Sequence, residues 1–176
     1  SLANEILLES NFEGKNEVIR VMNEIIEKVC CGQMLDIVYG YKPINELTEK
    51  DVMDVYKMKT ATYTAEGPLH LGALLAGVKG DELKPLLDYG IVLGKAFQIR
   101  NDINDIFLSD KIGKPVGSDL EEGKCTLLIV KTFENCNEEE KKFILEKLGT
   151  KLSEEDIGRF MDIIKKHGLD YCEELC

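Results

Sequence analysis

The sequence contains no tryptophan, and only 7% of its 176 residues are aromatic. Because 44% of the residues are nonetheless hydrophobic, aliphatic side chains must supply most of the buried surface. No apolar run approaches the roughly 20 residues that a helix needs to cross a bilayer, and no signal peptide is recognisable. These absences predict a water-soluble, cytoplasmic protein without stable membrane insertion.

The cysteine and histidine pairs of zinc sites are also absent. None of the six cysteines forms a Cys-x-x-Cys pair, and the two histidines are the isolated His70 and His167. We therefore expect no zinc site, and reduced thiols of the kind found in a cytoplasmic protein.

Positive charge is scarce, since the formal net charge is -11. An acidic surface repels phosphate backbones, so we predict no nucleic-acid partner. A site for a smaller anion would need a local cluster of Lys or Arg, or metal ions held by carboxylates.

Apolar residues recur at helical spacing along nearly the whole chain, most clearly over residues 18–29, and no stretch alternates as a strand does. Thr48 and Asp51 form a capping-box-like helix start, and Gly67 and Pro68 are expected to break or restart the helix. We therefore predict an all-α fold in a single domain over residues 1–176. Further helices are expected over 83–107, from 126, over 138–148 and over 154–167, with a loop over 109–123.

The most informative segment is the end of the long helix, residues 97–105. Four polar side chains share one face of it: Gln98, Asn101, Asp102 and Asp105. Three apolar side chains occupy another: Ile99, Ile103 and Ile106. Two carboxylates one turn apart suit Mg²⁺, which binds one or two protein carboxylates together with waters and substrate phosphates. The alternative is a solvated polar face.

Two pairs nearer the N-terminus are weaker signals. Gln33 and Asp36 lie one turn apart late in an apolar helix, where a polar helix end is the simpler interpretation. Lys59 and Thr60 could hold a diphosphate through a point charge and a hydroxyl. By itself, Lys59 could equally be an ordinary surface lysine.

A glycine-rich segment directly after the acidic helix carries Lys114 and Lys124. Its glycines let a backbone approach a ligand closely, although the segment could also be only a flexible loop. No Walker sequence is present, so nucleotide binding is not implied.

The order and spacing of these segments closely resemble the trans-isoprenyl diphosphate synthases, also called the polyprenyl synthetase family. The matching motifs are Gly32 to Asp36, Lys59-Thr60, Phe97 to Asp105, Gly113 to Leu120 and Gly123 to Thr126. The resemblance extends over roughly residues 1–133. It implies an isoprenoid synthase helical bundle, represented here by its C-terminal helices.

The resemblance also implies a reaction. The family joins isopentenyl diphosphate to an allylic diphosphate, with Mg²⁺ bridging aspartates to the allylic diphosphate as it departs. An allylic carbocation forms, the alkene attacks, and a proton is lost. Family members are usually homodimers, and the stripe over residues 18–29 could serve that interface or belong to the core.

Roles for individual residues follow from the same resemblance. Asp102 and Asp105, with Asn101 beside them, correspond to magnesium ligands that Gln98 would reinforce. The residues matched to substrate-binding positions are Gln33, Asp36, Lys59, Thr60, Gln98, Lys114 and Lys124. Of these, Lys59 and Lys114 match ligands of the allylic diphosphate, and Thr60 lies near the reacting carbon.

Two departures from the family pattern carry expectations. Asn101 stands where the family has an aspartate, and its neutral oxygen should bind a metal more weakly. The first aspartate-rich motif and the basic residues that bind isopentenyl diphosphate do not occur in residues 1–176. We therefore expect this chain to be the C-terminal portion of a synthase and to be inactive as a prenyltransferase by itself.

Of three rival interpretations, two remain. A terpene cyclase would also begin its motif with Asn101-Asp102, but it is excluded because it needs Ser or Thr at position 105 and Glu at position 109, which hold Asp105 and Ser109. A non-catalytic subunit or remnant of the same family is favoured by Asn101 and by the missing first motif, and disfavoured by Lys59, Lys114 and Asp105. A generic acidic bundle would show no response to magnesium and diphosphate.

Overall fold

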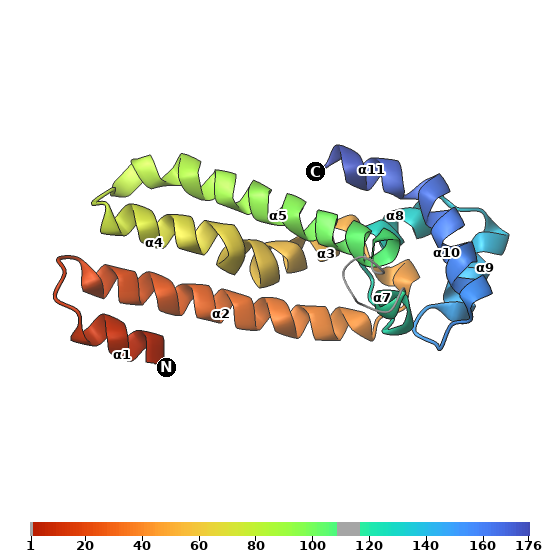
Figure 1. The fold of residues 1–176 in the computed structure, drawn as a ribbon, viewed down its shortest axis with the longest axis horizontal. Coiled ribbons are helices and arrows are strands. Elements are labelled where there is room, and N and C mark those ends of the chain that lie inside the picture. The colour runs from red at the N-terminus through yellow and green to blue at the C-terminus, as the bar shows by residue number, and fades with distance from the viewer. Residues whose placement is uncertain (1, 109–116) are drawn as a thin grey trace. The chain divides into compact units, whose positions relative to one another are not determined.

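The structure, a computed structural model, describes residues 2–108 and 117–176. In these ranges every regular element is a helix (Figure 1), which confirms the predicted all-α fold. No helix in the described part of the chain combines the length and the apolar character needed to cross a membrane. In chain order the elements are α1 (Leu2–Glu9), α2 (Lys15–Gly40), η1 (Ile44–Glu46), α3 (Glu49–Val55), η2 (Tyr56–Glu66), α4 (Gly67–Leu75), η3 (Gly80–Glu82), α5 (Leu83–Phe107), α7 (Ser118–Glu121), α8 (Leu127–Asn135), α9 (Glu138–Lys147), α10 (Glu154–His167) and α11 (Leu169–Glu174).

The predicted helix start at Thr48 is confirmed. The Thr48 backbone N–H donates to the Asp51 carboxylate at 3.0 Å, and the Asp51 backbone N–H donates to Thr48 Oγ1 at 3.3 Å. This reciprocal pair satisfies two N–H groups that a helix start otherwise leaves unbonded.

One local prediction is confirmed and one is wrong. A new helix, α4, begins at Gly67 with Pro68 in its first turn, as a restart requires, although Gly67 itself is helical (φ -61°, ψ -54°) and the chain does not bend out of helical conformation there. The preceding element η2 is a π-helix, so Pro68 falls where the hydrogen-bond register changes and its missing N–H is tolerated. Residues 118–121 form the short helix α7 rather than a loop, and its N-cap, Gly117, has a left-handed backbone (φ +79°).

The chain divides into two compact units. Unit 1 comprises residues up to 35 and 55–95, and unit 2 comprises residues 36–54 and 96 onward. A single domain over residues 1–176 stays a prediction.

Within unit 1, η2 and α4 lie between α2 and the first part of α5 (Figure 1). Glycines permit this packing, because a Cβ at Gly94 would lie 2.4 Å from the Cα of Ala61 on η2. A Cβ at Gly32 of α2 would lie 2.4 Å from the backbone N of Lys59 on the other side. The π-helix is therefore held by backbone-to-backbone contact on both faces.

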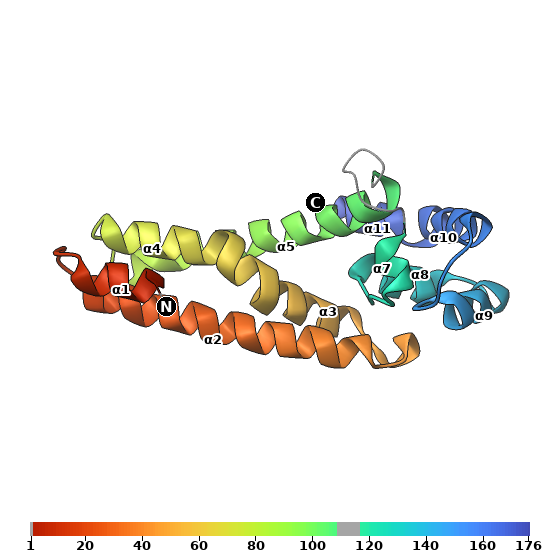
Figure 2. The ribbon, with the colours of Figure 1, turned by 60° about the horizontal axis from the view of Figure 1, so that its bottom comes forward.

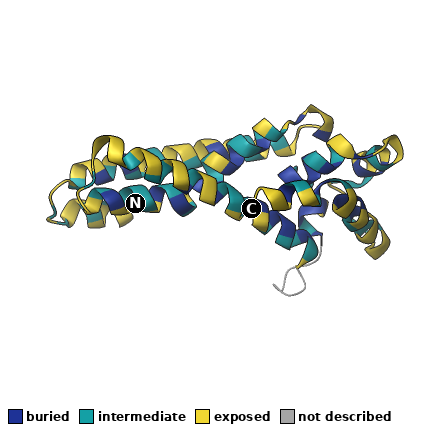
Figure 3. Cartoon of the chain, turned by 90° about the horizontal axis from the view of Figure 1, so that it is seen from above, coloured by how far each residue is buried: buried dark blue, intermediate teal, exposed yellow. Residues whose placement is uncertain are grey.

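Within unit 2, α8 packs against α9, α10 and α11 (Figure 2). Five consecutive residues, Thr126 to Val130, are buried where α8 begins. A continuous buried run indicates a helix covered on all sides. Figure 3 shows the contrast with α1, which contributes no buried residue.

Candidate functional site

The end of α5 carries the predicted metal-binding residues on unit 2. Ile99, Ile103 and Ile106 are 2%, 5% and 2% exposed, so the predicted apolar face is confirmed. Asp102 is only 5% exposed and shares this buried side, one turn from Ile99 and Ile106. Its burial differs from the solvated polar face that the spacing alone allows.

Gln98 holds the buried carboxylate. Its side-chain amide Nε2 donates to Asp102 Oδ1 at 2.8 Å. Burying a carboxylate costs free energy unless hydrogen bonds compensate for the lost water. Gln98 is thus in direct contact with Asp102, and its role at a metal site stays a prediction.

Asp105 and Asn101 flank Asp102 and are half-buried. Across residues 2–108 and 117–176, no three His, Cys, Asp or Glu side chains converge as a complete metal site. Magnesium does not require such a cluster, because it keeps waters and takes phosphate oxygens as ligands. Two carboxylates and an amide oxygen on adjacent turns fit a magnesium ion shared with a diphosphate.

Lys59 and Thr60 lie on η2 in unit 1, in the middle of an 11-residue π-helix. Thr60 is 6% exposed and Lys59 is half-buried, so Lys59 is not an ordinary exposed lysine. The Thr62 hydroxyl donates to the carbonyl of Lys57 at 2.8 Å. π-helices are rare and concentrate at functional sites.

Periodicity did not predict the π-helix. The signal that could have indicated it is the threonine run at 60, 62 and 64, because threonine hydroxyls bond to carbonyls of the preceding turn. Gln33 is adjacent to Gly32, at the point where α2 meets η2, and is exposed. Gly32 and Lys59 therefore meet at one helix contact in unit 1, and Gln33 and Thr60 are their immediate neighbours in the sequence.

The glycine-rich segment is described only in part, and Lys114 lies outside the described residues. Lys124 Nζ pairs with Asp119 at 2.6 Å and with Glu122 at 3.0 Å. Partial burial acts to lower the pKa of Lys124, but the bonds from these two carboxylates raise it above its usual range. A substrate role for Lys124 stays a prediction, and a diphosphate would compete there with Asp119 and Glu122.

Gly123 and Thr126 of the Gly123 to Thr126 motif stabilise the local structure. Gly123 has φ +70°, and a Cβ there would lie 3.1 Å from the Cα of Gly149. Thr126 Oγ1 accepts from the Ile129 backbone N–H at 3.4 Å and caps α8. Only glycine at 123 fits both the left-handed backbone and the close approach.

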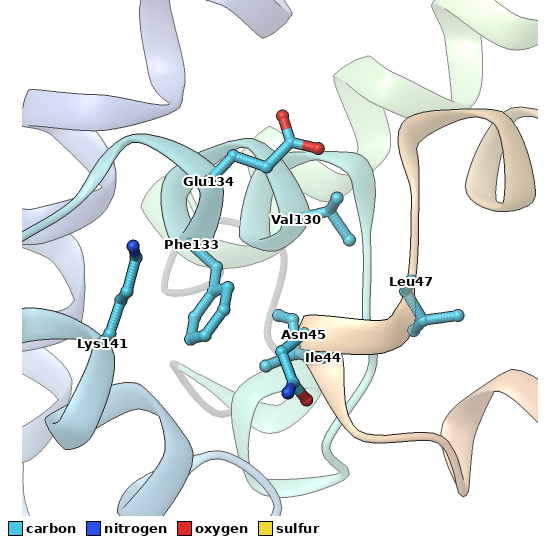
Figure 4. Close-up of a pocket in the computed structure, with 7 residues that line it drawn as sticks. All are labelled: Ile44, Asn45, Leu47, Val130, Phe133, Glu134 and Lys141. Atoms are coloured by element: carbon cyan, nitrogen blue, oxygen red, sulfur yellow. The ribbon is translucent and has the colours of Figure 1, made fainter. Parts of the chain in front are cut away.

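A hollow of about 240 Å³ in unit 2 lies apart from the predicted residues. Figure 4 shows the Phe133 ring between Lys141 and the segment with Ile44 and Asn45. The residues that line this hollow are Ile44, Asn45, Leu47, Val130, Phe133, Glu134 and Lys141. None of them was predicted to bind a substrate or metal.

The sequence of this chain is similar to that of a known protein family. The family model described as polyprenyl synthetase matches residues 1–164. The chain belongs to this family. The predicted isoprenoid synthase fold is thereby confirmed, and the chain is similar to short-chain prenyltransferases.

Several relatives of this polyprenyl synthetase family member are archaeal. A geranylgeranyl diphosphate synthase of Sulfolobus acidocaldarius is 42% identical over 146 residues, 82% of this chain and 43% of the relative. One from Saccharolobus solfataricus is 34% identical, with 99% of this chain and 56% of the relative covered. The chain spans about half the length of the curated relatives it matches.

Solved structures agree. A geranylgeranyl pyrophosphate synthetase from Pyrococcus horikoshii superposes with a TM-score of 0.86 at 31% identity, covering 98% of this chain and 53% of that one. A geranylgeranyl pyrophosphate synthase from Corynebacterium glutamicum, complexed with isoprenyl diphosphate and magnesium, gives 0.85 at 31% identity, covering 94% of this chain and 47% of that one.

Proposed function

We propose that this chain is part of a prenyltransferase that condenses isopentenyl diphosphate with an allylic diphosphate. The observation that carries the proposal is the carboxylate of Asp102, which is 5% exposed, hydrogen-bonded by Gln98 and one turn from Asp105. Membership of the polyprenyl synthetase family supports the substrate class. A cytoplasmic location stays a prediction.

In this proposal Asp102 and Asp105 hold Mg²⁺, with the neutral oxygen of Asn101 beside them. Bound magnesium supplies positive charge that stabilises the departing diphosphate. Gln98 fixes the orientation of Asp102, because its side-chain amide donates a hydrogen bond to Oδ1 of that carboxylate. The donor set is oxygen-rich, as a hard cation prefers.

Lys59 and Lys114 bind the oxygens of the allylic diphosphate as point charges. The family resemblance assigns Thr60 a place near the reacting carbon, Gln33 and Asp36 roles in binding the substrate, and Lys124 a further positive charge. The half-buried position of Lys59 supports this role, since a charge that is partly shielded from water attracts an anion more strongly.

The chain by itself is expected to be inactive, because the family's first aspartate motif and its basic residues do not occur in residues 1–176. A homodimer also stays a prediction. Val18 and Val21 are 4% and 1% exposed in the core of unit 1, whereas Ile26 is 42% exposed. A dimer contact on α2 would therefore use Ile26 rather than the two buried valines.

A non-catalytic subunit of the same family is the second candidate. Asn101 favours it, because a neutral ligand lowers the charge available to a metal. An Asn101→Asp variant should bind Mg²⁺ more tightly if the site is functional. An unchanged magnesium midpoint in that variant would count against the metal role of position 101.

The test of the metal site measures the thermal midpoint, Tm, with MgCl₂ and inorganic pyrophosphate. Ligands at about 100 times their Kd stabilise a folded protein by about 2.7 kcal/mol, so a clear rise in Tm is expected. Asp105→Asn should remove most of the rise. Asp88→Asn, which removes a surface pair with Lys84 on the same helix, should keep it.

A wild-type Tm that does not respond to the two ligands together would contradict the proposal. Catalysis is tested separately with radiolabelled isopentenyl diphosphate and an allylic diphosphate. The expected result is no condensation product from this chain alone, and turnover would refute the expected inactivity.

A further inference from the structure

The last helix, α11, is fastened to unit 2 by a polar cluster that the proposed reaction does not use. Glu49 of α3 accepts from the Tyr171 hydroxyl at 2.7 Å and from Lys131 Nζ of α8 at 3.1 Å. Lys131 also pairs with Glu134 at 2.7 Å and lies 4.5 Å from the centroid of the Tyr171 ring. Three helices distant in sequence are thus joined through Tyr171.

The partial burial of Lys131 strengthens the hydrogen bonds of this cluster. Its side chain is only 15% exposed, and hydrogen bonds between charged groups strengthen as water is excluded. The Tyr171 hydroxyl lowers the pKa of Glu49, and Lys131 acts in the same direction. The carboxylate is therefore held ionised between its two donors.

Beyond Tyr171, α11 lies along the part of α5 that carries the metal-binding residues (Figures 1 and 2). Cys176 Sγ is 3.7 Å from the carbonyl oxygen of Ala96, and Glu173 is 3.8 Å from Arg100. Cys172 is fully buried on the same side. Burial raises its pKa to about 12, and the negative charge of Asp102 contributes.

These contacts place the C-terminal end of the chain beside the turn of α5 that leads to Asp102. Glu173 lies next to Arg100 and Cys176 next to Ala96, and Cys172 is on the same side of the chain as Cys176, one turn away. Cys172 is 0% exposed and Asp102 is 5% exposed, so both side chains are shielded from bulk water. Gln98 holds Asp102 from its own helix, and α11 packs against the same turn of α5 from outside it.

We propose that α11 is a positioning element for the metal site, in which Tyr171, held by Glu49 and Lys131, keeps Cys172 packed against α5 and thereby fixes Asp102. The inference rests on the proposed magnesium role of Asp102. Neighbours that orient a metal ligand directly change metal affinity by roughly 10–100-fold. Tyr171 acts one contact further away, so its removal should have a smaller effect.

The test uses Tyr171→Phe, which keeps the ring over Lys131 and removes only the hydroxyl. Two quantities are measured on the same protein. The alkylation rate of Cys172 by iodoacetamide, followed by peptide mass spectrometry, reports whether α11 stays on α5, and the exposed Cys30 and Cys31 are internal references. The Mg²⁺ midpoint of the pyrophosphate-dependent rise in Tm reports the metal site.

Tyr171→Phe should speed the alkylation of Cys172 relative to Cys30 and raise the Mg²⁺ midpoint about threefold to tenfold, less than a direct ligand partner would. Glu49→Gln should act in the same direction. The double variant should be little worse than either single variant, because both remove the same contact.

Ser153→Ala is the matched control. It removes a hydrogen-bonded helix cap, Ser153 with Asp156 at the start of α10, and should lower Tm without altering either readout. A Tyr171→Phe protein with faster Cys172 alkylation and an unchanged Mg²⁺ midpoint would overturn the positioning role alone, as would unchanged alkylation. A wild-type protein without a magnesium response would overturn the proposed function and this inference together.

Discussion

Unit 2 is filled by large apolar side chains, whereas unit 1 is closed by small ones. Nearly all of the large side chains below 2% exposure belong to unit 2, among them Phe160, Leu127 and Ile164. In unit 1 helix backbones meet closely at Gly32, Gly90 and Gly94, where an added Cβ would clash. Unit 2 has such an approach too, at Gly168, so the units differ chiefly in where the large buried apolar side chains lie, and hydrophobic burial contributes most to unit 2.

Both units also expose large apolar side chains, among them Tyr41 of unit 2, which is 89% exposed. In unit 1, Leu2, Val92 and Tyr89 are 73%, 66% and 59% exposed. Such residues contribute little to the stability of this chain, because their surface stays in contact with water. Unit 1 should thus tolerate changes to its exposed apolar side chains and lose stability when a closely packed glycine such as Gly94 is replaced, and unit 2 should be most sensitive in its core.

The largest effect is expected for Phe160→Ala in unit 2. Phe160 is 0% exposed and its ring lies 4.9 Å from that of Phe143, so truncation should lower the free energy of unfolding by about 3–5 kcal/mol. Val92→Ala in unit 1 should change it by less than about 0.5 kcal/mol. Urea unfolding checks both, and similar losses would remove the contrast between the units.

Gly94→Ala tests the backbone contact in unit 1. The added methyl group would lie 2.4 Å from the Cα of Ala61, so the helices must separate, at a cost of about 1–3 kcal/mol. Gly72→Ala on α4 meets no atom within 4 Å and should instead stabilise by about 0.5–1 kcal/mol, through helix propensity. Thermal unfolding of the two variants should show shifts of opposite sign.

Acid should weaken unit 2 through Glu49. The Tyr171 hydroxyl and Lys131 lower the pKa of Glu49 from 4.5 in the folded chain. The stability that ionised Glu49 gives the fold is therefore complete above its pKa in the unfolded chain, and it is lost as pH falls through its lower pKa in the folded chain. Tm should therefore drop below about pH 4.5 more steeply in wild type than in Glu49→Gln. Parallel Tm curves for the two proteins would exclude this contribution.

The smallest effect is expected at the surface of unit 1. Arg20 pairs with Glu17 and Glu24, but its side chain is 54% exposed, and water screens such pairs. Arg20→Ala should therefore leave Tm without a resolvable change, at both low and high salt. A clear salt-dependent loss would mean that surface charge supports unit 1 more than its packing suggests.

Much of the fold could be predicted because helix signals are local. Thr48 and Asp51 lie within one turn of each other, and so the helix cap follows from their spacing alone. The isoleucines of α5 lie within two turns of one another, and their shared face follows from spacing in the same way. Helical spacing does not show that the chain stays helical through Pro68, because this depends on the π-helix before it. That helix lies against Gly32 and Gly94, which are distant in sequence.

The amino-acid sequence alone determined the family motifs, the all-α fold and the residues to consider at the metal site, because these depend on residue type and short spacing. Only the tertiary structure decided that Asp102 is buried and that α11 lies along α5. Both depend on contacts across long separations, such as Glu49 with Tyr171, 122 positions apart. Helical periodicity can divide a helix into faces, but only packing decides which neighbour covers each face.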